Sequence, residues 1–573
     1  MTENLASVSQ QDLDNAIKDK FEVKYSPDGT RLLKGNPLLF DGSVDAFVVC
    51  IDYFDNEDSQ IKKYSVKEST QVICDEAFKL STSLESIYLP DSVKVIGARA
   101  FDSCYRLEKI NLPDSIVAIK EYAFYACESI KEVTIPKNLV KLEKSVFCSC
   151  KTLRKVKFND TLQQIGEFVF NSCGLEKIIL PKSVKEIGKY AFAFCKKLKY
   201  IKLPETLEVI GAGAFACCES LKKIVIPKNC RFIGDGAFNG CEDIELKNNS
   251  PYFSYENGML IHKESKTLIL GNNLIPDNIS IIGDFAFSGF GFHRITIPDS
   301  VKEIHRRAFL GCNSLEEIII PNTVQYIGEG LFYECSSLKS VVLSCRVNKI
   351  ESYLFEKCES LTNIVFPNSV QKIGSRAFYG CNSLVKLEIP NSVQEIENCA
   401  FQECQSLTEI KIPNSVKHIG YCAFGKCSSL EKIVLPNKLE KISNKLFYKC
   451  KSLKEINIPD SVTEIRTEAF AFCKSLKEIV IPESVTMIGS EAFMYCEKLE
   501  TIVLPKSITE IYSKTFWGCY SLKKIVLPHT IQSIDFYAFK FCRALKEILV
   551  PRKHLERIQK LLPEILRNRC KIY

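Results

Sequence analysis

Several residue types and sequence patterns are scarce in this chain of 573 residues. Its six histidines form no H-E-x-x-H or H-x-x-x-H group of the kind that indicates a metal site. No stretch approaches the roughly 18 consecutive apolar residues of a membrane-spanning helix. The first residues lack the basic patch and apolar run of a secretory signal, so we expect a reducing compartment and free thiols.

A large excess of charge of one sign is also missing. The chain has 76 Lys and Arg against 69 Asp and Glu, which disfavours a polybasic nucleic-acid binder. The sequence contains no G-x-x-x-x-G-K-[ST], no G-x-G-x-x-G after a strand and no G-x-S-x-G motif. We therefore expect no enzymatic activity, no cofactor, no metal ion and no nucleic-acid partner.

Phenylalanine, in contrast, recurs at a fixed spacing. From Phe78 to Phe238 and again from Phe287 to Phe539 the interval is 23 residues, apart from two intervals of 22. One interval of 49 residues separates the two blocks. A fixed period of 20 to 29 residues that is rich in Leu and Ile is typical of a leucine-rich-repeat solenoid.

Residues 476–496 show the repeat unit, with the consensus L-x-x-I-x-I-P-x-S-V-x-x-I-G-x-x-A-F-x-x-C-x-S. The alternating aliphatics of L-x-x-I-x-I predict a half-buried strand, which the proline ends. S-V-x-x-I-G predicts an extended piece that turns at glycine, and x-x-A-F-x-x-C predicts one helical turn. Each unit buries about five apolar side chains, so stacked units must share one continuous core.

The expected fold class is therefore an α/β repeat solenoid. It is a leucine-rich-repeat right-handed superhelix of about 20 coils, with parallel strands on its concave face. The repeats predict one long domain with a first block at 70–241 and a second block at 287–551.

The pattern P-x-S-V-x-x-I-G-x-x-A-F-x-x-C with its 23-residue period resembles the BspA-like class of leucine-rich repeats over about residues 70–551. The resemblance implies a binding or surface protein and not an enzyme. Some bacterial members of this class are adhesins, and some protist members end in a prenylation box.

Three regions depart from the repeat. Residues 242–286 hold an irregular repeat with a β-hairpin insertion, in which Asn257-Gly258 marks the turn. Residues 1–69 are expected to cap one end, with a short helix after Ser7 and a second hairpin over 22–34. Residues 552–573 read as a capping helix, interrupted at Pro563, followed by a basic tail.

Eighteen of the 27 cysteines occupy one slot, three residues after the repeat phenylalanine. Equivalent slots on successive coils point in parallel, which is poor disulfide geometry, and metal sites need clustered spacings. We expect these thiols to pack as small hydrophobic side chains. A redox or metal role stays open for a few others, of which Cys399 and Cys422 share a slot on adjacent coils.

One row of strand residues is expected to face solvent on the concave side between two inward aliphatics. The row is mostly polar or mixed in the first block and becomes apolar in the second, which often marks a partner surface. Lateral packing of β-branched residues is the alternative explanation. The predicted partner-binding residues are Ile319, Val342, Val365, Val434, Val480, Val503 and Val526.

The sequence closes with Cys570-Lys-Ile-Tyr573, a C-a-a-X arrangement that predicts prenylation of Cys570, although the final tyrosine departs from the usual residues. Seven Lys and Arg against two Glu over 552–571 suit an anionic inner leaflet. The leading hypothesis is a non-catalytic solenoid that binds unidentified proteins at the cytoplasmic face of the plasma membrane. The alternatives are a cell-surface adhesin that leaves the cell by unconventional export, and a soluble intracellular adaptor.

Overall fold

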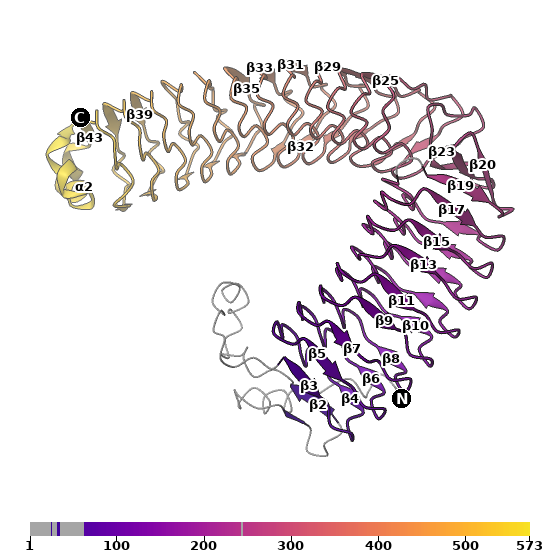
Figure 1. Cartoon of the computed structure of the whole chain (residues 1–573). Coiled ribbons are helices and arrows are strands. Elements are labelled where there is room, and N and C mark those ends of the chain that lie inside the picture. Colours follow the sequence, from indigo (N-terminus) through magenta and orange to yellow (C-terminus); the bar gives the residue numbers. More distant parts are fainter. Residues whose placement is uncertain (1–23, 26–30, 35–61, 242–243) are drawn as a thin grey trace. The chain divides into compact units, whose positions relative to one another are not determined.

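The computed structural model describes residues 24–25, 31–34, 62–241 and 244–573 (Figure 1). Its described coils form a parallel-strand β-solenoid of about 22 turns with little helix. The chain divides into two compact units, unit 1 up to Gly271 and unit 2 from Asn272 onward. The helix expected after Ser7 lies outside the described residues.

Ladder A is the row of parallel strands formed by the L-x-x-I-x-I segments. Its strands are two to four residues long, and an inward aliphatic lies next to an outward residue, as in Glu409–Lys411, where only the central Ile410 is buried. In unit 1 the strands are β3 (Lys63–Ser65), β5 (Ser86–Tyr88), β7 (Lys109–Ile110), β9 (Glu132–Thr134), β11 (Lys155–Lys157), β13 (Lys177–Ile179), β15 (Tyr200–Lys202), β17 (Lys223–Ile226) and β19 (Glu245–Asn248). In unit 2 they are β25 (Glu317–Ile319), β27 (Ser340–Val342), β29 (Asn363–Val365), β31 (Lys386–Glu388), β33 (Glu409–Lys411), β35 (Lys432–Val434), β39 (Thr501–Val503), β41 (Lys524–Val526) and β43 (Glu547–Val550). Strand β44 (Cys570–Ile572), which lies after the last repeat, pairs with β43 and extends the ladder.

Ladder B is a second parallel row, formed by the V-x-x-I segments that follow the repeat proline. Each coil contributes two residues, and the aliphatic one points into the core. In unit 1 the strands are β4 (Val72–Ile73), β6 (Val95–Ile96), β8 (Ala118–Ile119), β10 (Lys141–Leu142), β12 (Gln164–Ile165), β14 (Glu186–Ile187), β16 (Val209–Ile210) and β18 (Phe232–Ile233). In unit 2 they are β23 (Ile281–Ile282), β24 (Glu303–Ile304), β26 (Tyr326–Ile327), β28 (Lys349–Ile350), β30 (Lys372–Ile373), β32 (Glu395–Ile396), β34 (His418–Ile419), β36 (Lys441–Ile442), β37 (Glu464–Ile465), β38 (Met487–Ile488), β40 (Glu510–Ile511) and β42 (Ser533–Ile534).

The segment x-x-A-F-x-x-C does not form the helical turn that the sequence predicted. In the coil of Phe101, Ala100, Asp102 and Cys104 each donate to the carbonyl three residues earlier, whereas the alternate amides donate to the next coil. Arg99 and Ser103 adopt left-handed φ values of 54° and 62°. The prediction of a helix was wrong, because the segment forms successive turns in which every second N–H points along the solenoid axis. These N–H groups donate to the next coil and form a third ladder, which we call the turn ladder.

The repeat phenylalanines stack into one continuous column within each unit. In unit 1 the column runs from Phe78 to Phe238, and in unit 2 it runs from Phe287 to Phe539. Neighbouring ring centroids such as those of Phe401 and Phe424 are 5.3 Å apart with planes within 6° of parallel. Because a single coil lacks this contact, the rings bind the coils to one another, as a solenoid requires.

Antiparallel strands occur where the repeat is interrupted. Strands β20 (Phe253–Glu256) and β21 (Met259–His262) form a hairpin, with Asn257 and Gly258 at positive φ in its two-residue turn, and β22 (Thr267–Leu270) pairs with β21. Near the other end of unit 1, β1 (Lys24–Tyr25) pairs antiparallel with β2 (Arg31–Lys34). Strand β2 also pairs with β4, so this hairpin extends the ladder B sheet.

A cap formed by residues 552–573 ends unit 2 (Figure 1). It contains η3 (Arg552–His554), α2 (Leu555–Leu561), η4 (Glu564–Arg569) and strand β44. Pro563 lies between α2 and η4, while Ile558 and Leu566 cover the end of the core. None of the helices in the described part of the chain has the length and apolar character needed to cross a bilayer.

Candidate functional site

The cysteine slot is a structural feature and not a reactive site. All 18 thiols of the slot are free and buried. Each Sγ lies 3.0–3.3 Å from the carbonyl oxygen of the phenylalanine in the preceding coil, as Cys427 does with Phe401. Burial raises the pKa of Cys195 and of Cys427 to about 12, so these sulfurs stay protonated and donate the hydrogen bond.

Cys399 differs from the slot thiols in environment. It lies on the turn side of unit 2, half-buried, with Cys422 in the equivalent position of the next coil. A hydrogen bond from Cys422 and the nearby guanidinium of Arg376 lower the pKa of Cys399 to about 7. The same hydrogen bond raises the pKa of Cys422, which stays the donor. This pair therefore favours a thiolate at Cys399 near neutral pH. In the slot, a hydrogen bond from Cys218 also lowers the pKa of Cys241.

The predicted apolar row lies on ladder A of unit 2, and its side chains point away from the core. Ile319 and Val480 are the most exposed, at 66% and 77%, and Val526 is half-buried. Ile319, Val342 and Val365 are direct partners across adjacent strands. Parallel strands lie about 4.8 Å apart, so adjacent members of the row lie side by side.

The structure divides this row into two apolar patches. The first consists of Ile319, Val342 and Val365. The second, which we call the C-terminal apolar patch, consists of Val480, Val503, Val526 and Leu549. Between them the row positions are held by Glu388, Lys411, Val434 and Asn457, so Val434 stands alone between polar residues.

Charged side chains flank the row on ladder A. Lys386 lies 2.6 Å from Glu409, and Lys523 lies 2.8 Å from Glu500 on neighbouring coils. The hydrogen bond from each lysine lowers the pKa of its glutamate. These exposed pairs alternate in sign, so they form a solvated border to the row and contribute little stability.

Cys570, the predicted lipidation residue, lies within strand β44. It is the direct partner of Ile548, and so takes the position that the inward aliphatic occupies in other coils of ladder A. Burial raises the pKa of this half-buried thiol. Lys571 forms an ion pair with Glu547 at 2.6 Å, and the amide of Tyr573 donates to the carbonyl of Val550. The C-a-a-X residues are thus part of the cap.

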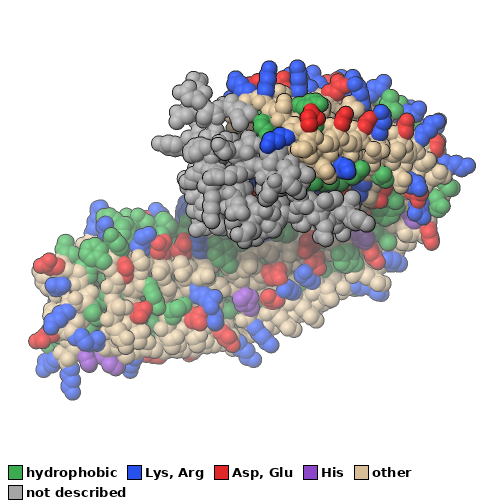
Figure 2. Space-filling model, turned by 90° about the horizontal axis from the view of Figure 1, so that it is seen from below, with side chains coloured by type: hydrophobic (Ala, Val, Ile, Leu, Met, Phe, Trp, Pro, Cys, Tyr) green, Lys and Arg blue, Asp and Glu red, His purple; other side chains and the backbone are tan. Residues whose placement is uncertain are grey.

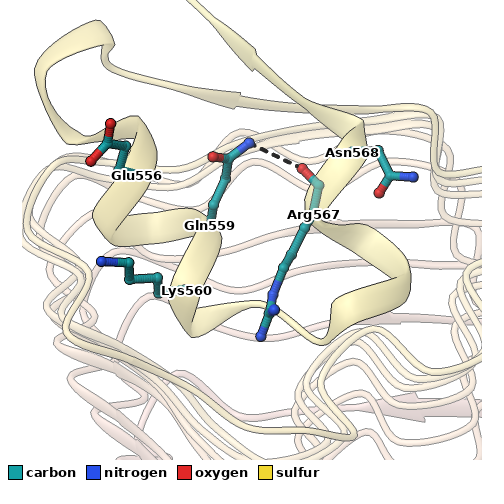
Figure 3. A pocket seen from close by; sticks show the side chains of 5 residues that line it. All are labelled: Glu556, Gln559, Lys560, Arg567 and Asn568. Atoms are coloured by element: carbon teal, nitrogen blue, oxygen red, sulfur yellow. Dashed lines mark hydrogen bonds between the residues drawn. The ribbon is translucent and has the colours of Figure 1, made fainter.

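A shallow hollow in the cap is open to solvent (Figure 3). Its lining is polar, and the amide of Gln559 donates to the backbone carbonyl of Arg567 at 3.2 Å across it. The lining residues Glu556, Gln559, Lys560, Arg567 and Asn568 all belong to α2 and η4 or lie between them. The arrangement orders the cap and presents no group of side chains poised for chemistry.

One group of surface residues was missed by the sequence analysis. We call it the aromatic ridge, and it places one aromatic side chain per coil along the turn ladder of unit 2. Its residues are Tyr448, Phe472, Tyr495, Trp517 and Phe541. The signal was an aromatic residue one or two positions after the repeat phenylalanine in five successive coils, which the variable spacing obscured.

Comparison with known proteins places this repeat in a family. The model of the BspA type leucine rich repeat region matches five segments that together span most of the chain. The matched segments are residues 51–151, 118–245, 266–385, 348–477 and 463–562. The chain belongs to the BspA-type leucine-rich-repeat family.

Three of the solved structures that are similar to this BspA-type chain come from bacteria. A leucine-rich repeat protein from Bacteroides ovatus is 26% identical, with 74% of this chain and 91% of that chain covered and a TM-score of 0.33. A leucine rich cell surface protein from Faecalibacterium prausnitzii is 22% identical, with 72% and 93% covered and a TM-score of 0.41. The pneumococcal vaccine antigen PcpA is 19% identical, with 76% and 85% covered and a TM-score of 0.32. A search among curated proteins finds no match.

Proposed function

We propose that this BspA-type solenoid is a non-catalytic protein-binding protein, and that the C-terminal apolar patch is its main contact surface. The observation that carries the proposal is the run of Val480, Val503, Val526 and Leu549 on adjacent coils of ladder A, with their side chains outward. Four aliphatic side chains at one register position form a continuous strip about 15 Å long. Strips of this kind favour a protein partner with apolar side chains at its own surface.

The magnitude of the contact is consistent with a specific interaction of moderate strength. Covering an exposed valine contributes about 1.5 kcal/mol, so the strip supplies part of the roughly 8 kcal/mol of a micromolar complex. The remainder would come from the flanking charges of ladder A, including Lys524 and Glu547, which give the contact its orientation. Membership of a repeat family without a recurrent catalytic motif supports a binding role.

Affinity capture tests the proposal with a double variant. The intact chain and a Val480→Glu, Val503→Glu chain are immobilised and exposed to native cell extract, and partner recovery is compared by mass spectrometry. Val140→Glu is the control, because Val140 is also an exposed valine but lies in unit 1, next to ladder B. We expect the double variant to lose partners that the control retains. Equal recovery from all three chains contradicts the proposal.

The location of the protein distinguishes two forms of this proposal. Attachment to the cytoplasmic face of the plasma membrane through Cys570 stays a prediction, and the pairing of β44 with β43 means that a modifying enzyme must first detach the tail. A cell-surface role is the alternative, and the similar protein from F. prausnitzii is a leucine rich cell surface protein. Protease treatment of intact cells separates them, since only a surface-exposed chain is cleaved.

A further inference from the structure

The aromatic ridge is continuous over the last five coils of unit 2. Phe472 and Tyr495 stack with centroids 5.0 Å apart, and the indole N–H of Trp517 donates to the hydroxyl of Tyr495 at 3.3 Å. Trp517 then meets Phe541 edge to face at 4.9 Å. The end of unit 2 that carries the C terminus shows hydrophobic, basic and acidic side chains intermixed at its surface (Figure 2).

Cations lie over aromatic rings at the exposed end of this ridge, both on the ridge and on the adjacent Tyr537 and Tyr520. The ammonium of Lys540 is 5.1 Å from the Trp517 ring, 5.3 Å from Tyr537 and 5.5 Å from Phe541. Arg543 lies 5.7 Å from the ring of Tyr520. Contact with the rings holds these two exposed cations in place.

The two cations differ in pairing from Lys514 and Lys445 on the same side of unit 2, whereas Lys449, over Tyr448 and Phe472, likewise forms no ion pair with the described residues. Lys514 also contacts Trp517 but forms an ion pair with Glu491, and Lys445 over Tyr448 pairs with Glu468. Within the described residues, neither Lys540 nor Arg543 has a carboxylate within ion-pair distance. The end of the ridge therefore carries two oriented positive charges that a partner's carboxylates can neutralise.

The turn ladder is also open at this end. In the coil of Phe493 the amides of Glu491, Phe493 and Tyr495 donate to carbonyls of the following coil. The equivalent amides after Asp535 are those of Tyr537, Phe539 and Phe541. The first donates to the carboxylate of Asp535, and the other two have no acceptor among the residues that the structure describes.

Among the described residues, the cap forms no hydrogen bond with the open edge of the turn ladder. Arg557 donates to the carbonyls of His529 and Ile531, Arg569 donates to that of Leu545, and β44 pairs with β43. These contacts lie on ladder A and at the start of ladder B. Phe541 stays 44% exposed.

We propose that the open turn edge at Tyr537–Phe541 binds an extended acidic segment of a partner protein. Carbonyls of that segment accept from the amides of Phe539 and Phe541, as each following coil does for its predecessor, and its carboxylates meet Lys540 and Arg543. An apolar side chain of the segment packs on Trp517 and Phe541. The backbone donors favour a peptide over a membrane surface, which has no ordered row of carbonyls to match them.

Trp517 provides the readout, because it is the only tryptophan of the chain. The full chain is titrated with a synthetic peptide of alternating Glu and Leu and with a matched peptide of alternating Lys and Leu. Trp517 fluorescence and amide hydrogen exchange at Phe541 are followed. We expect the acidic peptide to change the fluorescence and slow the exchange, with an affinity that falls as salt rises.

A charge-reversed chain and a matched control complete the test. The double substitution Lys540→Glu, Arg543→Glu is expected to lower the affinity for the acidic peptide by about tenfold or more. Lys177→Glu is the control, since Lys177 also lies over an aromatic ring, Tyr200, in unit 1. Equal weakening in both chains, or no fluorescence change, overturns the proposal. So does binding to phosphatidylserine vesicles without peptide binding, or concentration-dependent self-association that buries Trp517.

Discussion

The thiol of Cys427 donates a hydrogen bond to the backbone carbonyl of Phe401, 3.0 Å away in the preceding coil. The same carbonyl already accepts the amide of Cys404 in its own coil. A carbonyl oxygen has two lone pairs, so the thiol satisfies the one that the turn leaves free. This relationship explains why the slot holds cysteine and not another small apolar residue.

Replacing Cys427 with alanine should therefore destabilise the solenoid by about 1–3 kcal/mol. The change removes the donor and leaves a small cavity beside the phenylalanine column. Chemical denaturation followed by circular dichroism measures the effect. Cys345→Ala is the control, because Cys345 is exposed and should change the denaturation midpoint little. Equal effects at the two positions would show that the buried hydrogen bond contributes nothing.

Stability should also fall at alkaline pH because of the buried thiols. Burial raises the pKa of Cys427 from an ordinary value of 9.0 to about 12, whereas the thiol of the unfolded chain ionises near 9. The contribution is thus fully present below pH 9 and is lost as the pH rises toward 12, at about 1.4 kcal/mol per pH unit for each such thiol. The free energy of unfolding of the natural chain should fall faster between pH 9 and 10.5 than that of Cys427→Ala. Parallel pH profiles would contradict this assignment.

Cys399 should be the most reactive thiol of the turn side near neutral pH. Its pKa of about 7 leaves a large fraction as thiolate at pH 7.5, and it is half-buried. Brief treatment with iodoacetamide followed by peptide mass spectrometry should find Cys399 alkylated before the buried slot thiols. Arg376→Gln should slow the alkylation, because it removes the positive charge beside the sulfur. An unchanged rate would mean that the guanidinium does not act on this thiol.

The sequence predicted the structure well at positions where the same residue type plays the same structural role in every coil. Phe78 through Phe539 and the 18 slot cysteines set the register, and their burial follows from the need of each coil for its neighbour. The outward direction of Val480 followed from strand alternation alone. The family and the solenoid fold were therefore predictable from the repeat.

The turn conformation was not predictable from the same pattern. Arg99, Ser103 and their equivalents adopt left-handed φ values, yet many of these residues are not glycine. The residue types at these positions therefore did not indicate the left-handed conformation. The aromatic ridge was missed because its residues alternate between two positions after the repeat phenylalanine. The position of Cys570 depended on where the chain returns to ladder A after α2 and η4, which is a tertiary property.

The left-handed positions lead to a prediction of increased stability. Ser149 has a φ of 62°, and its amide donates to the carbonyl of Asn171 in the next coil. A left-handed conformation costs a residue with a Cβ about 1 kcal/mol, which glycine avoids. Ser149→Gly should therefore raise the unfolding midpoint slightly, and Ser149→Val should lower it. Thermal denaturation checks both, and an increase with valine would contradict the backbone argument.

Residues 570–573 have two competing interpretations, as part of the folded cap or as the site of a lipid anchor. Because Cys570 takes an inward aliphatic position beside Ile548, Cys570→Ile should slow amide exchange in β43 and β44, since isoleucine fills that position in most other coils. Removal of residues 570–573 should have the opposite effect on β43. Intact mass spectrometry of the chain from its native cells then shows whether Cys570 carries an isoprenoid. A modified Cys570 together with unprotected β44 amides would establish the anchor, whereas an unmodified thiol with protected amides leaves the cap as the role of this segment.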